Sequence, residues 1–398
     1  MKKYFLMLAL IGGLLTGCSK ADEAEKKPLP DGPDPAPAPI PEDKLIEAGK
    51  AYTLSPEVGG PNEPNQVYVD LSSGKMTSVR RDTWDLAFYC GDDFRVILNS
   101  SIAMTVKETP STDIHKFVAP DDKILFSDDP KLPSQKLVTD HLIDDPRGIL
   151  QEEKELEGTG TAIARVSEKE EENKVYLLNR GNEISTTTPE VGGINLQGAH
   201  RGFMKIRIKR SGNGYELSYA KNDELKDIKT VTISKDPEYN FVFLSLTTGQ
   251  KVQVQPKKKN WDLCFSPSTS WFSTQKEKIG SPFNSATFLP DLIISNLHGQ
   301  TKATIFQSSD KSEEKRNAEY TAYTKEKALK IDFSEERYNS QMVIGRNWRD
   351  NQTGALIRNE LFYLIKDGDG NYFKLKMLAM KNDKGERGCP SFEYELLK

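Results

Sequence analysis

The sequence has few of the residues that build catalytic and metal sites. It contains four histidines and four cysteines in 398 residues. It has no Gly-x-Ser-x-Gly, His-Glu-x-x-His or P-loop motif and no Cys-x-x-Cys pair. The usual signatures of hydrolases, metalloproteases, nucleotide-binding proteins and thiolate metal sites are therefore missing. We expect a binding protein rather than an enzyme.

The sequence also lacks an excess of positive charge and a long apolar run. The formal net charge is −4, with 55 basic and 59 acidic side chains, which argues against a nucleic-acid partner. Hydrophobic residues make up 36% and charged residues 29% of the chain, a balance typical of a well-solvated body. The length of 398 residues predicts two domains rather than one.

The N-terminus has the pattern of an export signal. Lys2 and Lys3 precede an apolar stretch, residues 4–15, that is too short to span a bilayer. The following Leu15-Thr16-Gly17-Cys18 resembles the lipobox of bacterial lipoproteins. We therefore predict a signal peptide over residues 1–17 and acyl chains on Cys18, which would anchor the protein to the outer membrane. An ordinary secretory signal that happens to contain a cysteine is the alternative.

A proline-rich tether is predicted over residues 18–48. Seven prolines between positions 28 and 41 alternate with small or polar residues and favour an extended polyproline II spacer. The acidic stretch that follows Cys18 resembles the short export signal of surface-exposed lipoproteins, although a simple polar tether explains it equally well.

Beyond the tether, a pattern of strands occurs twice. Residues 67–74 read as a strand and a glycine turn, and residues 84–88 give Trp-Asp-Leu-Ala-Phe. The same order recurs at residues 241–249 and 261–265. A later alternating strand at residues 204–208 matches residues 373–377. We infer a tandem duplication of one all-β domain, with copies at residues 49–233 and 234–398.

The aromatic residues of the repeated unit are predicted to be structural. Alternation along a strand would place Trp84, Leu86 and Phe88 on one buried face. Asp85 would point to the other face, where a turn N–H or a basic side chain could satisfy it. The middles of the copies, residues 110–173 and 267–351, do not match each other and read as long polar loops. We expect any ligand site in these loops.

The repeated unit is similar to the opening of the HmuY-like family. The closing strands at residues 372–377 and 391–394 also resemble that family. These proteins are haem-binding surface lipoproteins of Gram-negative bacteria. The resemblance implies all-β sheet domains with long loops and a ligand cleft at one end. The duplication is a departure, since the typical member has a single domain.

The resemblance implies haem as the cofactor, held by axial His or Met ligands. The candidates in the first copy are His115, His141 and Met104, and in the second copy His298 and Met342. They are chosen by region, because no local motif surrounds them. For each histidine the alternative is an ordinary surface residue. No metal is predicted beyond haem iron.

The predicted function is haem or related tetrapyrrole binding at the cell surface for iron acquisition. The partner that receives the haem would be an outer-membrane transporter, and the lipid anchor would be the only membrane contact. An alternative is a lipoprotein of the same fold without haem ligation, acting as an adhesin or an accessory glycan- or protein-binding module. A glycan-processing enzyme would need a cleft with paired carboxylates.

The three internal cysteines, Cys90, Cys264 and Cys389, allow one disulfide at most. A Cys264–Cys389 bridge and three separate thiols both fit the sequence.

Overall fold

Antiparallel strands make up most of the structure. We describe a computed structural model over residues 45–120, 124–129, 132–139, 142–154, 158–273, 284–350 and 356–398. Within these ranges the α-helices are α1 (Glu313–Thr321) and α2 (Lys325–Ala328). The expected all-β fold class is therefore confirmed. The predicted lipidation site, Cys18, lies outside the described residues, as do most of the tether residues.

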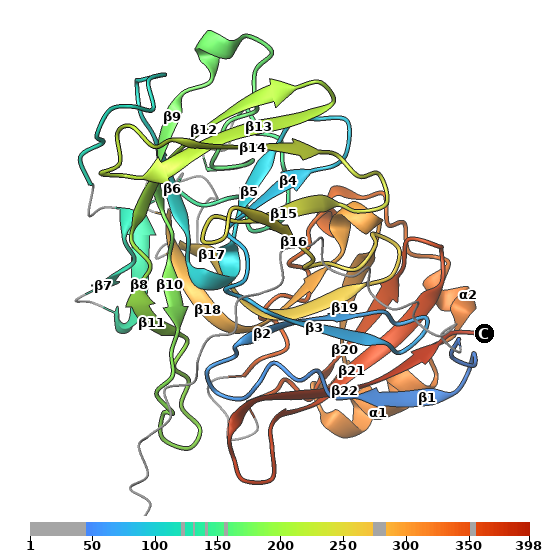
Figure 1. Cartoon of the computed structure of the whole chain (residues 1–398). Coiled ribbons are helices and arrows are strands. Elements are labelled where there is room, and N and C mark those ends of the chain that lie inside the picture. The colour runs from blue at the N-terminus through green and yellow to red at the C-terminus, as the bar shows by residue number, and fades with distance from the viewer. Residues whose placement is uncertain are drawn as a thin grey trace, which may run out of the picture. The chain divides into compact units, whose positions relative to one another are not determined.

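Four large sheets and one small ribbon hold the strands (Figure 1). We call them the first outer, first inner, second inner and second outer sheets. The first outer sheet has the order β14 (Lys229–Ser234), β13 (Gly214–Lys221), β12 (Phe203–Ser211), β9 (Val175–Asn179) and β6 (Thr105–Glu108). The first inner sheet has the order β16 (Gln250–Val252), β15 (Phe241–Ser245), β4 (Leu86–Tyr89) and β5 (Val96–Leu98).

The second pair of sheets repeats this arrangement with longer strands. The second inner sheet has the order β3 (Met76–Arg80), β2 (Asn65–Val69), β17 (Leu263–Ser273), β18 (Asn284–Ser295), β8 (Leu132–Thr139) and β7 (Ser127–Asp129). The second outer sheet has the order β1 (Ala51–Leu54), β22 (Arg387–Leu396), β21 (Tyr372–Lys381), β20 (Leu361–Lys366) and β19 (Lys302–Gln307). The ribbon pairs β10 (Asn182–Ile184) with β11 (Gln197–His200).

Three hydrophobic clusters lie between successive sheets. One joins the first outer and first inner sheets and includes Leu86, Phe88 and Leu244. A second joins the second inner and second outer sheets and includes Val67 and Val69. A central cluster, with side chains such as Tyr68 and Phe243, lies between the two inner sheets. Neighbouring residues of one inner strand thus enter different clusters, as the two-residue period of a strand requires. Both faces of the inner sheets are buried at their central strands, such as β2, β4 and β15, while the edge strands β3 and β16 are largely exposed.

The two copies exchange their opening strands. β15, which opens the second copy, pairs with β4 of the first copy, so that Leu244 lies opposite Leu86. β2, which opens the first copy, pairs with β17 of the second copy, so that Val69 lies opposite Leu263. These positions correspond in the repeat, so the exchange is reciprocal and keeps one register. The sheets that result join strands of both copies, and residues Asp43–Lys398 form one compact unit.

The leading edge strands follow the same rule. β1 precedes the first copy's opening hairpin but pairs with β22 at the end of the second copy. β14 precedes the second copy's hairpin and pairs with β13 at the end of the first copy. Each outer sheet therefore gains an edge strand from the segment that leads into the other copy's opening hairpin.

The aromatic residues of the repeated unit are core residues, as expected, but one lies on an unexpected face. Trp84 and Trp261 are each 4% exposed. The prediction that Trp84 shares a face with Leu86 and Phe88 is wrong, because Trp84 belongs to the central cluster and packs edge-on against Phe243. The strand begins only at Leu86, so the alternation of a strand does not extend back to Trp84.

The second copy's middle is more regular than predicted. β17 and β18 form a hairpin with a bulge between Ser266 and Ser268, which accommodates Pro267 within a long strand. Further on, α1 begins after Ser312, whose hydroxyl accepts a hydrogen bond from the Lys315 N–H at 3.1 Å. The expectation of an irregular loop across residues 267–351 is therefore wrong for these segments.

Candidate binding cleft

A cleft of about 640 Å³ lies at one end of the first outer and first inner sheets. This volume is within the range of roughly 300–1,000 Å³ typical of small-molecule and cofactor sites. Strands β12 and β13, the turns beside them and the β15–β16 turn supply its walls. The lining residues are Arg180, Arg201, Gly202, Phe203, Met204, Tyr219, Ala220, Lys221, Asp223, Glu224, Asp227, Lys229, Leu246 and Thr247.

The inner wall of the cleft is apolar. Met204, Tyr219 and Leu246 line it and also belong to the hydrophobic cluster between the two sheets. Met204 lies opposite Lys221 in the β12–β13 pair. Burial raises the pKa of the Tyr219 hydroxyl above its ordinary value, so this hydroxyl is neutral at physiological pH. A flat apolar ligand would find contact area on this wall.

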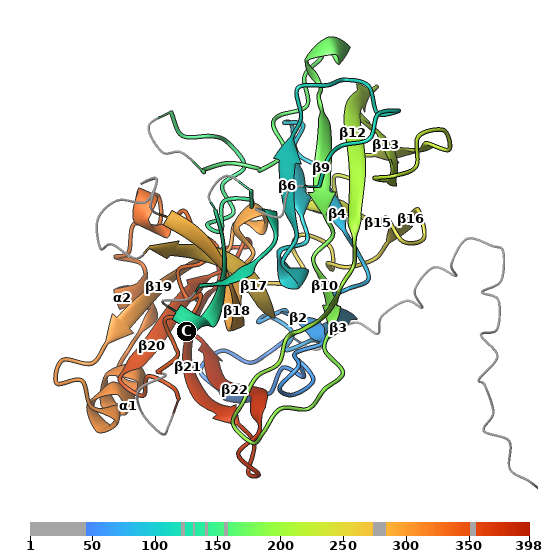
Figure 2. The ribbon, with the colours of Figure 1, turned by 90° about the vertical axis from the view of Figure 1, so that its left-hand side faces the viewer.

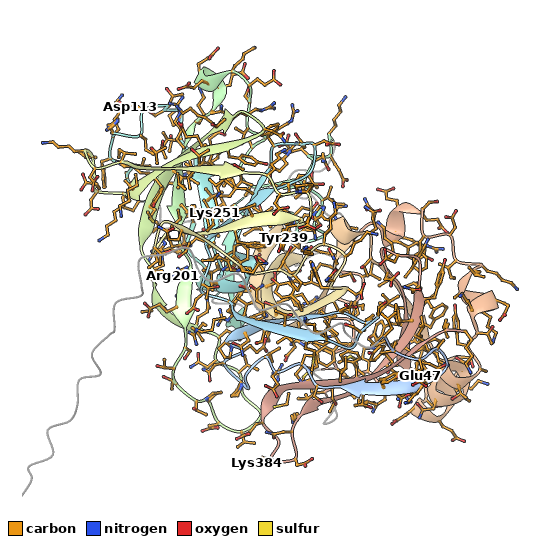
Figure 3. All side chains as sticks on the ribbon, turned by 45° about the vertical axis from the view of Figure 1, so that its right-hand side comes forward. Glu47, Asp113, Arg201, Tyr239, Lys251 and Lys384 are labelled. Carbon is orange, nitrogen blue, oxygen red and sulfur yellow. The ribbon has the colours of Figure 1, made fainter. Side chains whose placement is uncertain are left out.

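Two arginines form one end of the cleft. Nη2 of Arg180 lies 3.1 Å from Oδ1 of Asp85, and Nη1 of Arg201 lies 2.9 Å from the same oxygen. Arg180 also donates to the Thr247 hydroxyl at 2.6 Å. Arg201, labelled in Figure 3, stands in the turn between β11 and β12. Burial lowers its pKa and Asp85 opposes that shift. The Arg201 guanidinium remains charged, because an arginine pKa starts far above neutrality.

The opposite end of the cleft carries acidic side chains. Asp223, Glu224 and Asp227 lie in the loop that follows β13. Backbone N–H groups of Asp227 and Lys226 hydrogen-bond to the Glu224 carboxylate and lower its pKa. Lys221 and Lys229, which flank this loop, also line the cleft, so the loop carries charges of both signs while the arginine end is cationic.

Comparison with protein-family models shows to which family the chain belongs. The sequence model described as "HmuY protein" matches residues 62–229 and again residues 237–394, which together span most of the chain. The chain belongs to the HmuY family. Two tandem copies of the HmuY domain are present, as the repeat predicted. A comparison with curated proteins gives no match.

Two solved structures of HmuY relatives are similar to this chain at low identity. The crystal structure of the Tannerella forsythia apo HmuY analog (TFO) is 11% identical, with 89% of this chain and 100% of that chain covered and a TM-score of 0.22. The crystal structure of apo PinO from Porphyromonas gingivitis is 10% identical, with 88% and 99% covered and a TM-score of 0.23. At these TM-scores the two structures add nothing to the fold assignment of this HmuY-family chain.

His115 lies beside the cleft, on the outer side of the first outer sheet. It is exposed, and its Nδ1 is 3.0 Å from the carbonyl oxygen of Leu225, in the loop that also carries the acidic side chains. The next residue, Lys116, accepts a hydrogen bond from Lys205 Nζ at 3.0 Å through its carbonyl oxygen. Lys205 follows Met204 in β12, and neighbouring side chains of a strand point to opposite faces. His115 and the cleft-lining Met204 are therefore on opposite sides of this HmuY sheet.

The other first-copy candidates are differently placed. Met104 is 1% exposed and packs in the hydrophobic cluster between the first two sheets. His141 lies outside the described residues. The assignment of His115, His141 and Met104 as iron ligands stays a prediction.

The second-copy candidates also lie away from the large cleft. His298 packs against the rings of Tyr89 and Phe241, each with a centroid distance of 5.4 Å. Burial lowers its pKa to about 4, so the ring is neutral at physiological pH. His298 lines a separate cavity of about 90 Å³, which is too small for a tetrapyrrole. Met342 is half-buried, and its N–H donates to the Ser340 hydroxyl at 3.1 Å. Ligation by His298 or Met342 stays a prediction.

Sequence reasoning missed Met204 and the arginine pair. Met204 was identified only as part of an alternating strand, and Arg180 and Arg201 are 21 positions apart with no motif around either. Their convergence depends on the pairing of β9 with β12, which brings the ends of both strands together. A charged pair at the ends of two adjacent strands is the only signal that the sequence offered.

Other kinds of site are not found in the part of the HmuY chain that the structure describes. The described residues hold no cluster of three or more His, Cys, Asp or Glu side chains suited to a metal ion. Cys90, Cys264 and Cys389 are all free thiols, so the Cys264–Cys389 bridge is not formed. No described helix has both the length and the apolar character needed to cross a bilayer.

Proposed function

We propose that this chain is a surface lipoprotein that binds haem or a related tetrapyrrole and delivers it to an outer-membrane transporter. HmuY-family membership and the cleft of about 640 Å³ support the ligand class. The lipobox-like segment that ends at Cys18 supports the lipid anchor and outer-membrane location. The cleft is the single observation that carries the proposal, because it combines sufficient volume with an apolar wall.

The chemistry of the cleft suits a tetrapyrrole. The macrocycle is flat and apolar and would pack against Phe203, Tyr219 and Leu246, which supply ring and branched side-chain surface. Its acidic substituents need water or cations, and the cleft has cationic side chains at its edge. Binding would bury the macrocycle without any chemical step, so the proposed role is that of a carrier and not of an enzyme.

Met204 is the candidate iron ligand inside the cleft. A methionine thioether is one of the axial ligands that haem iron accepts in proteins. Met204 lines the cleft from β12, a strand hydrogen-bonded on both sides, which would hold the sulfur in place. His115 and His141, in the loops of the first copy, remain the alternative ligands predicted from the sequence.

Haemin titration of a protein that contains residues 43–398 tests the proposal. We expect a saturable shift of the Soret band at one haemin per chain. Met204→Leu should alter the position of the band, because leucine fills a similar volume at a cost below about 1.5 kcal/mol but has no sulfur. Met76→Leu, at an exposed methionine in β3, is the matched control and should leave the spectrum unchanged.

The histidine alternatives are tested in the same titration. A spectral change in His115→Ala or His141→Ala, with none in Met204→Leu, would indicate that the loop histidines and not Met204 bind the iron. Absence of any Soret shift in the wild-type protein would refute haem binding and would favour the adhesin or accessory glycan- or protein-binding alternative.

A further inference from the structure

The two copies provide an internal comparison for the aspartate of the repeated Trp-Asp-Leu unit. In the first copy, Asp85 accepts a hydrogen bond from the N–H of Leu246 at 2.7 Å. In the second copy, Asp262 accepts the corresponding bond from the N–H of Leu71 at 2.9 Å. Both aspartates therefore have the same structural role, because each binds the backbone of the other copy's opening hairpin.

The two aspartates differ in their remaining partners. Asp262 has the Thr301 hydroxyl at 3.1 Å, and in the described part of the chain no Arg or Lys is paired with it. Asp85 has both Arg180 and Arg201. Since Asp262 makes the equivalent hydrogen bond to Leu71 with no cation beside it, the hydrogen bond that holds the hairpin does not itself require the arginine pair. The pair is an addition specific to the copy that has the large cleft.

The charges at this end of the cleft do not balance. Asp85 is one anion between two guanidinium groups. A further carboxylate that acts on Arg201, Asp82, forms an ion pair with Arg80 at 2.9 Å, so the two side chains together add no net charge. One positive charge is therefore left over at the Arg180–Arg201 end. The arginine side chains are only 14% and 9% exposed, so this charge sits in a partly desolvated position, where an anion binds more strongly than at an open surface.

Unused donors accompany the excess charge. Arg180 directs Nε and Nη2 to Asp85, and Arg201 directs Nη1 to Asp85 and to the carbonyl oxygen of Arg180. Each guanidinium group has five N–H donors in a planar fork. Arg180 Nη1 and Arg201 Nη2 have no acceptor among the described residues. Such N–H groups match the geometry of a carboxylate.

We propose that Arg180 and Arg201 form a carboxylate-binding site, so that the ligand of the cleft is an acid anchored through its carboxylate at this end. The inference rests on the proposed function and narrows the ligand to a tetrapyrrole with free acid groups. Asp85 is a positioning residue, because it holds both guanidinium groups in place without reaching the ligand. Thr247, from the second copy, has the same role for Arg180, so the site uses both copies.

Comparison of haemin with haemin dimethyl ester tests this inference, because esterification removes the negative charges and leaves the macrocycle and the iron. The wild-type chain should bind haemin roughly ten- to hundred-fold more tightly than the ester, as expected for a charge-assisted hydrogen bond. Arg201→Gln should lower the affinity for haemin by a similar factor and leave the affinity for the ester unchanged. Arg201→Lys keeps the positive charge but not the planar guanidinium group. Its affinity for haemin should lie between those of the wild type and Arg201→Gln.

Lys251→Gln is the charge-matched control, since it removes one positive charge from an exposed position in β16 (labelled in Figure 3). It should leave the ratio of haemin to ester affinity unchanged. Equal wild-type affinity for haemin and ester, or an unchanged ratio in Arg201→Gln, would overturn the carboxylate site while leaving haem binding intact. No Soret shift with either compound would instead refute the proposed function. The wild-type comparison needs no variant to fold.

Discussion

The carboxylate of Asp262 accepts a hydrogen bond from the backbone N–H of Leu71, 191 residues earlier in the chain, at 2.9 Å. Asp85 makes the equivalent bond to Leu246, 161 residues later. Each bond crosses from the Trp-Asp-Leu unit of one copy to the opening hairpin of the other. The most recognisable motif of the sequence therefore has a structural purpose, which is to join the two copies. The strands that pair across the copies, β4 with β15 and β17 with β2, can be followed in the ribbon of Figure 2.

The exchanged strands predict that neither half folds alone. Residues 43–235 would lack β15 beside β4, and residues 236–398 would lack β2 beside β17. We expect each fragment to show no cooperative thermal transition by circular dichroism, and an equimolar mixture to recover one. The full 43–398 chain is the control. A cooperative transition in either isolated fragment would contradict the interdependence.

Asp262 predicts a pH dependence of stability. Burial, followed by the nearby Asp367 and Asp70, raises its pKa to about 7. The folded state therefore keeps a proton that the unfolded state releases near pH 4. The stabilisation that this protonated carboxyl contributes to folding is full below pH 4 and is lost as the pH rises towards 7. Asp262→Asn removes this dependence. The amount by which the unfolding free energy of Asp262→Asn falls below that of wild type should decrease by roughly 2–4 kcal/mol between pH 4.5 and pH 7.5.

Urea denaturation at several pH values measures this effect. Asp92→Asn, at an exposed position, removes the same side-chain charge and should give a constant difference from wild type. Asp144 is a second carboxyl, half-buried, whose pKa is raised to about 7 by desolvation, so part of the wild-type slope should persist in Asp262→Asn. A difference between wild type and Asp262→Asn that does not vary with pH would contradict the prediction.

Two asparagines in equivalent positions are predicted to be critical for stability. The Asn99 side chain donates to the carbonyl oxygens of Arg81 and Trp84, at 2.7 and 2.8 Å, and is completely buried. Asn296 donates to those of Lys258 and Trp261, both at 2.8 Å. Alanine at either position removes both of these hydrogen bonds.

The expected cost of Asn99→Ala or Asn296→Ala is roughly 2–4 kcal/mol of unfolding free energy, from two or more lost buried hydrogen bonds. Asn347→Ala is the control, because Asn347 is exposed and its side chain makes one local hydrogen bond, to Val343. Its effect should stay within about 0.5 kcal/mol, as for most surface substitutions. A similar loss in all three variants would show that burial of the amide is not decisive.

The free thiols predict that stability does not depend on redox state. Cys90, Cys264 and Cys389 form no disulfide, so the Tm of residues 43–398 should be the same with and without dithiothreitol. A thiol reagent should modify Cys264 only after unfolding, since this side chain is 3% exposed and burial raises its pKa. A Tm that falls on reduction would indicate an oxidised pair.

The sequence predicted the strands and the duplication, because both depend on local pattern. The role of Asp85 was also anticipated, since a buried carboxylate between two apolar neighbours needs a turn N–H or a cation, and it has both. The exchange was not predictable in this way. β2 and β15 have the same pattern and the same register, so nothing local says whether Val69 pairs within its own copy or with Leu263.

The cleft could not be predicted from the sequence for a related reason. Arg180, Arg201 and Thr247 come from three separate turns and converge only through the pairing of β9, β12 and β15 with their neighbours. The histidine ligands predicted for the first copy lie in its unmatched middle, yet the cleft is built at the ends of regular strands. Propensity and spacing describe such strands well but do not identify which of their ends enclose a cavity.

The reciprocal exchange has a consequence for how the two copies can change over time. Deletion of one copy would remove a strand from an inner sheet and from an outer sheet of the survivor, so the duplication cannot be undone by a simple loss of half the gene. The inner sheets are therefore locked together, while the surfaces around them are free to diverge. Arg180 and Arg201 beside Asp85, set against Thr301 beside Asp262, show that such divergence has already given the two halves unequal chemistry.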